Sequence, residues 1–71
     1  MTCKQLGGAC DLVFSGLTFD DLAAQSQRHG REMFQAGDGP HVAAMAIMME
    51  LMNSGGMDSW MAERRTEFDA L

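Results

Sequence analysis

The segment that most constrains this chain is the run from Val42 to Met52, which is apolar around its whole circumference if it forms a helix. It reads Val-Ala-Ala-Met-Ala-Ile-Met-Met-Glu-Leu-Met, and Glu50 is its one formal charge. A helix with no polar face is normally buried, because a helix at the surface keeps polar side chains on its outer side. The sequence therefore predicts a buried helix at the centre of the fold.

Local signals mark the ends of this helix and place another helix on either side of it. Asp38 is a good N-terminal cap and Pro40 fits the first helical turn, so we expect the central helix to span residues 39–53. Thr18, followed closely by acidic residues, should begin a helix over residues 18–36. Apolar residues at helical spacing predict a third helix over residues 57–70.

Residues 1–17 have a different pattern, with two short runs on either side of Gly7-Gly8. Paired glycines accept the positive φ of a tight turn, which is typical of a β-hairpin. With the glycines at the turn, Cys3 would lie opposite Leu12. The sequence thus predicts a single α+β domain over residues 1–71, in which an N-terminal β-hairpin packs on three α-helices and the middle helix is buried.

The chain has few residues with which to cover its central helix. A domain of 71 residues buries only roughly 60% of its unfolded surface. A second copy, docked across a two-fold axis, would shelter the methionines, so we predict a homo-oligomer and favour a dimer. The alternatives are a monomer whose alanines face solvent and a contact with a different protein. The candidate interface residues are Met45, Met48, Met49, Met52 and Trp60.

Composition argues against several classes of partner. Ten acidic residues against five basic ones make a net charge of −5, whereas phosphate binding depends on Lys and Arg. No apolar run approaches the ~20 residues that cross a bilayer, and no secretory signal is visible. We therefore expect a cytoplasmic protein without nucleic-acid or membrane partners. In that compartment, the two cysteines are better explained as reduced thiols or metal ligands than as a disulfide.

Cys3, Cys10 and His29 are the candidate metal ligands. A turn between the cysteines can aim both thiolates at one point, a neighbouring helix can add an imidazole, and zinc takes four such ligands. The fourth ligand is open between His41, Asp11 and solvent. His41 is the harder choice, because it begins a helix on the order of 10 Å from His29 along the helix axis. The alternative is that both cysteines are small buried apolar residues and His29 binds nothing.

No convincing catalytic set is present. A Cys–His nucleophile needs a cleft, a base within reach and an oxyanion site, which a chain of this length rarely supplies. We therefore predict a non-catalytic protein that acts through self-association and protein contact. The main alternative is a small metal-binding module that holds a zinc-like ion with Cys3, Cys10 and His29. A cysteine-dependent enzyme is a distant third.

The string from Cys3 to Asp11, together with Thr18-Phe-Asp-Asp and His29, resembles a family of small bacterial proteins known only as a domain of unknown function. The resemblance implies a two-cysteine hairpin followed by a helix that carries a histidine, and it implies no established activity. Short members of that family often have a second histidine five residues after the first, where this chain has Phe34. A metal here would therefore recruit another ligand from this chain, from solvent or from a neighbouring chain.

Overall fold

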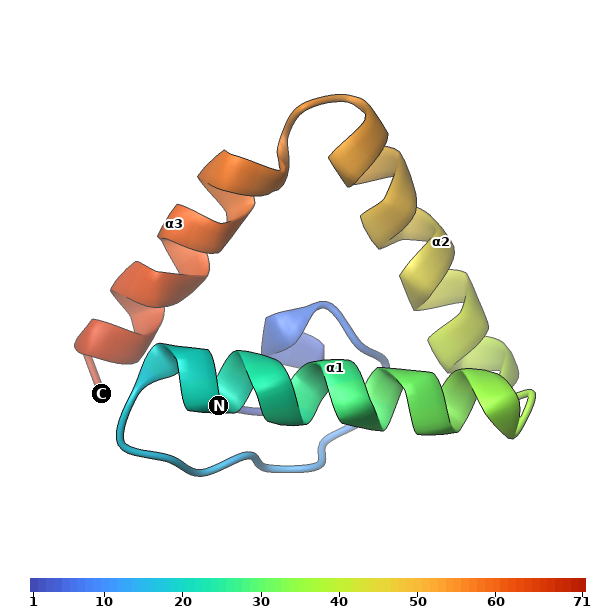
Figure 1. Cartoon of the computed structure of the whole chain (residues 1–71), viewed down its shortest axis with the longest axis horizontal. Helices are drawn as coiled ribbons and strands as arrows, with labels where there is room; N and C mark the ends of the chain where they lie inside the picture. Colours follow the sequence, from blue (N-terminus) through green and yellow to red (C-terminus); the bar gives the residue numbers. More distant parts are fainter.

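The computed structural model describes residues 1–71 and consists of helices joined by short turns. A short 3₁₀ helix, η1 (Lys4–Leu6), precedes α1 (Phe19–Gln35), α2 (Gly39–Asn53) and α3 (Met57–Asp69). The three α-helices form the sides of a triangle, with η1 inside its outline (Figure 1). The molecule is flat, with extents of 33 × 27 × 15 Å. No helix combines the length and the apolar character needed to cross a membrane.

Side-chain caps begin the first two α-helices. The Thr18 hydroxyl accepts a hydrogen bond from the Asp21 N–H at 3.2 Å, and the Asp38 carboxylate accepts one from the His41 N–H at 3.1 Å. Gly37 (φ +71°) provides the left-handed residue that lets the chain leave α1 and enter α2 almost at once. These caps act within one helical turn, so each helix starts where its local sequence directs it.

The predicted β-hairpin at the N-terminus is wrong, and the fold is all-α. Residues 1–14 contain one isolated antiparallel bridge, between Thr2 and Val13, and no strand. Inside that bridge the chain turns on itself, because the Gly7 N–H donates to the Lys4 carbonyl and the Gly8 N–H to the Cys3 carbonyl. Backbone groups used in this turn are not available for a ladder between strands.

A small apolar core lies between the N-terminal segment and the first half of α1. Its most buried member is Leu22, which is 1% exposed. Helix α3 reaches the core through Phe68, whose ring meets that of Phe19 edge-on at a centroid distance of 6.1 Å. The six buried apolar residues are Met1, Cys3, Leu6, Phe14, Phe19 and Leu22.

The expected burial of the middle helix is also wrong for the single chain. Within α2, His41 is the one buried residue, whereas Ile47 is 66% and Met49 59% exposed. Helix α2 forms one side of the triangle and meets α1 at its beginning and the turn to α3 at its end (Figure 1). A flat molecule has no third layer to cover the outer side of such a helix, so its apolar residues face solvent.

Candidate metal centre

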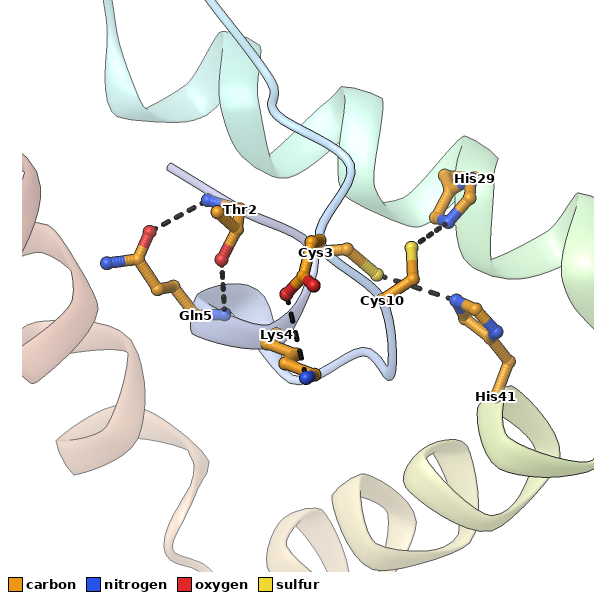
Figure 2. A network of polar contacts seen from close by, with 8 residues as sticks. Thr2, Cys3, Lys4, Gln5, Cys10, His29 and His41 are labelled. Atoms are coloured by element: carbon orange, nitrogen blue, oxygen red, sulfur yellow. Dashed lines mark hydrogen bonds and ion pairs between the residues drawn. The ribbon is translucent and has the colours of Figure 1, made fainter.

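Two cysteines and two histidines from three parts of the chain meet at one point. The ligand atoms of Cys3, Cys10, His29 and His41 all lie within 4.8 Å of one another. The Cys10 Sγ is 3.3 Å from the His29 Nε2, and the Cys3 Sγ is 3.6 Å from the His41 Nε2. Figure 2 shows these four side chains pointing toward one another from the N-terminal segment, α1 and α2.

The two sulfur-to-nitrogen distances are of the length expected when both atoms bind one metal ion. With Zn–S bonds of about 2.3 Å and Zn–N bonds of about 2.0 Å, a sulfur and a nitrogen ligand stand ~3.5 Å apart. The two S···N distances of 3.3 and 3.6 Å lie on either side of that value. All separations in the group are within 4.8 Å, so the widest would have to shorten by at most about 1 Å for the four atoms to share one ion.

The turn that replaces the hairpin places both sulfur atoms. The Cys3 N–H donates to the Leu12 carbonyl at 2.8 Å and the Lys4 N–H to the Cys10 carbonyl at 3.0 Å, which holds the two cysteine backbones side by side. Gly8 passes so close to the Cys3 sulfur that a Cβ built on Gly8 would lie 2.1 Å from it. Only glycine leaves room for the Cys3 sulfur at this point.

Backbone N–H groups surround the sulfurs and affect the two thiols differently. The Leu12 N–H donates to the Cys10 sulfur and, with the neighbouring His29 side chain, lowers the pKa of that thiol to about 7. Burial raises the pKa of the Cys3 thiol above its ordinary value of 9.0, although the Cys10 and Ala9 N–H groups oppose this by donating to its sulfur. Donors of this kind stabilise thiolates and occur around sulfur ligands of metals.

Asp38 orients the imidazole of His41. Its carboxylate lies 2.5 Å from the His41 Nδ1, so that the Nε2 of the same ring is turned toward the Cys3 sulfur. This hydrogen bond raises the pKa of His41 and lowers the pKa of Asp38. A carboxylate on the far nitrogen of a histidine ligand fixes its tautomer and increases its basicity, as in many zinc sites.

The structure brings together the three predicted ligands and adds His41 rather than Asp11. The Asp11 side chain is 87% exposed and pairs with Lys4 at 3.6 Å. The predicted axial gap of ~10 Å did not keep His41 out of the cluster, because the centroids of the His29 and His41 rings are 5.1 Å apart. That expectation counted distance along the helix axis and left out the reach of two imidazoles that face each other.

The sequence did not predict the roles of two residues at this centre, Asp38 and Gly8. Asp38 was recognisable as a helix cap, but its spacing of three residues from His41 also allows a side-chain contact on the same helix face. Gly8 was interpreted as part of a hairpin turn, and its role in making room for the Cys3 sulfur depends on a close approach that only the folded chain shows.

Comparisons with protein-family models, with curated proteins and with solved structures found no match. The resemblance to a bacterial family with a two-cysteine N-terminal segment therefore stays a prediction. The donor set and its geometry are the observations on which a function can be argued.

Proposed function

We propose that this chain is a small zinc-binding module whose ligands are Cys3, Cys10, His29 and His41. The observation that carries the proposal is the convergence of their four ligand atoms within 4.8 Å. Two thiolates and two imidazoles in a tetrahedron form a donor set that zinc prefers, whereas magnesium and calcium select oxygen ligands. Zinc is therefore the metal that this set of side chains would favour.

The role that fits best is a structural one. The four side chains would fill every position of a tetrahedron, whereas catalytic zinc sites leave one position for water or substrate. They also come from segments far apart in the sequence, since Cys3 and His41 are separated by 38 residues. A shared ion would join the N-terminal segment to both α1 and α2.

A cross-link of this kind would add stability to a fold whose core is small. Only 7 of the 71 residues are buried, and chains of this size commonly depend on a metal, disulfides or oligomerisation for stability. Both cysteines are free thiols. The proposal places the chain in a reducing compartment such as the cytoplasm, where thiols stay available as ligands.

Elemental analysis of protein purified without chelator or nickel affinity tests this function. We expect about one equivalent of zinc per chain, together with the sulfur-to-metal absorption band of a tetrahedral thiolate site when cobalt replaces zinc. Cys3→Ser and Cys10→Ser should each reduce metal content strongly. Asp11→Asn is the matched control, because Asp11 is the rival ligand that lies outside the cluster.

Two outcomes would contradict the proposal. One is less than roughly a tenth of an equivalent of zinc, iron or copper in the unmodified chain, even after incubation with zinc. The other is metal that stays bound with unchanged affinity in both cysteine variants, since that would place the ion elsewhere.

A further inference from the structure

Four apolar side chains that are each more than a third exposed follow one face of α2. Val42 and Met45 are each 37% exposed, Met49 is 59% and Met52 is 56% exposed. Their spacing of three, four and three residues is that of alternate a and d positions in a coiled coil. We call this set of four residues the α2 stripe.

The stripe borders a shallow hollow lined only by methionines. The hollow has a volume of about 210 Å³ and opens between α2 and the start of α3. Its lining residues are Met45, Met48, Met49, Met52 and Met57. Flexible thioether side chains around a recess form an adaptable surface that accepts apolar side chains of another helix.

We propose that the α2 stripe is an interface with a second copy of this chain, packed antiparallel across a two-fold axis. In that arrangement Met45 faces Met49 of the second copy, and Val42 faces Met52 of the second copy. Each a position then meets a d position in both directions, so the surface is complementary to itself. The inference does not depend on zinc binding.

Charge favours a second copy on this face. The chain carries a net charge of −5, so two copies repel each other most weakly where acidic residues are few. Glu50 is the one acid in α2, and it lies about 100° around the helix from Met49. An antiparallel pairing keeps the two Glu50 side chains apart and sets the two helix dipoles in opposite directions. A parallel pairing would place the two Glu50 side chains at the same level and align the dipoles.

The area of the α2 stripe sets the expected affinity of the dimer. A standard interface buries about 800 Å² per partner, which would be a sixth of the 4738 Å² surface of this chain. Helix α2 is only ~22 Å long, so its stripe supplies less than that area. We therefore expect a dimer whose dissociation constant lies in the micromolar range.

Met48 and Trp60, which the sequence also suggested for an interface, lie outside the stripe. Both line an inner cavity of about 220 Å³ between the helices. Met48 also lies against Gly7, where an added Cβ would come within 2.8 Å of its sulfur. Trp60 therefore belongs to the inside of the triangle, and Met48 lies between the inner cavity and the methionine hollow.

Sedimentation velocity of the chain as purified, across concentrations from about 5 to about 500 µM, tests the interface. We expect the mass to rise from 7.7 kDa toward twice that value. Met49→Glu should weaken the dimer at least roughly tenfold, because it places an unpaired charge in the contact. Ile47→Glu is the control, since Ile47 is 66% exposed on another side of the same helix and the charge change is identical.

A mixing experiment tests the antiparallel pairing. Met45→Glu and Met49→Lys should each be monomeric alone, and an equimolar mixture should form a heterodimer, because the new Glu would face the new Lys. A parallel pairing would not place those positions together. Circular dichroism and zinc content of the same samples verify that the variants are folded and separate this question from metal binding.

Three results would overturn the proposal. They are a 7.7 kDa species at every concentration, a Met49→Glu variant that still dimerises, and an Ile47→Glu variant that loses the dimer as fully as Met49→Glu.

Discussion

Gly8 has the most demanding position in the candidate centre. It occupies the space beside the Cys3 sulfur that a side chain would need, and neighbouring Gly7 adopts φ +91° to end η1. The candidate centre thus depends on a residue that makes room for a ligand atom as well as on the residues that carry those atoms. We therefore expect that the effect of a substitution near the ligands on zinc binding depends on whether the new side chain fills the space beside the Cys3 sulfur.

We predict that Gly8→Ala removes most zinc binding, because its Cβ would lie 2.1 Å from the Cys3 sulfur. Gly30→Ala is the control, since a Cβ there meets nothing within 4 Å. In the interior of α1 that change should stabilise the chain by about 0.5–1 kcal/mol. Zinc content and thermal unfolding of both variants check this, and normal zinc content in Gly8→Ala would show that the turn is placed differently.

Asp38 performs two roles that substitution can separate. Asn caps a helix about as well as Asp, so Asp38→Asn should leave helix content nearly unchanged. Loss of the carboxylate 2.5 Å from the His41 Nδ1 should weaken zinc binding by roughly 10- to 100-fold. A competition titration with a coloured chelator measures the affinity, and an unchanged value would mean that His41 is not a ligand.

Zinc affinity should rise with pH, because binding requires both thiols to lose their protons. The pKa of Cys10 is about 7 and that of Cys3 is raised above 9.0, so near neutral pH Cys3 is protonated in the metal-free chain and Cys10 is about half protonated. The raised pKa of His41 adds to the same trend. We expect more than one proton released per zinc at pH 7. Calorimetric titration in buffers of different ionisation enthalpy tests this, and proton-free binding would contradict it.

At the scale of elements, α3 is the most weakly attached helix. None of its residues is buried and its N-terminus has no side-chain cap. It is held by the Phe68 contact with Phe19 and by Arg65, whose guanidinium lies 4.9 Å from the Phe19 ring centre and 3.3 Å from Asp20. Exposed ion pairs contribute little, so most of this attachment depends on the packing of Phe68 and Met61 against the core.

We therefore expect the amide protons of α3 to exchange with solvent faster than those in the first half of α1, which contains Phe19 and Leu22 of the core. Hydrogen exchange of the zinc-loaded chain, followed by NMR, measures this order. Phe68→Ala should accelerate exchange in α3 and leave zinc content unchanged. Equal protection in the two helices would show that α3 belongs to the same cooperative unit.

At the scale of the whole molecule, the metal would connect parts that the core alone joins weakly. The N-terminal segment contributes four of the six buried apolar residues, and it also carries both candidate sulfur ligands. Binding free energy at such a site becomes folding free energy when the unfolded chain has no preformed site. Stability of the fold and occupancy of the centre should therefore change together.

Removing zinc with a chelator should lower the thermal midpoint by at least about 10 °C, since a shift of 4–8 °C corresponds to roughly 1 kcal/mol in a domain of this size. Circular dichroism melting with and without added zinc measures the shift. Magnesium at the same concentration is the control, because it selects oxygen ligands. Superimposable melting curves would mean that the ion has no structural role.

The helix positions follow from the sequence because their signals are local. The expected range 18–36 and the observed Phe19–Gln35 differ by one residue at each end, since the Thr18 cap and Gly37 act within a single turn. The donor set was also visible, because two cysteines close in sequence and a helical histidine are the residue types that zinc uses. What the local pattern at Gly7-Gly8 could not distinguish was a hairpin turn from a turn that wraps around a sulfur.

The tertiary structure decided the rest, because it depends on how far-separated segments are oriented. The angle at which α2 leaves α1 brings His41 to within 3.6 Å of a sulfur 38 residues away, and neither periodicity nor capping encodes that angle. The same arrangement leaves the apolar outer face of α2 open in the single chain. Residue types thus determined which chemistry was possible, and the packing of helices around a small core decided which side chains could take part.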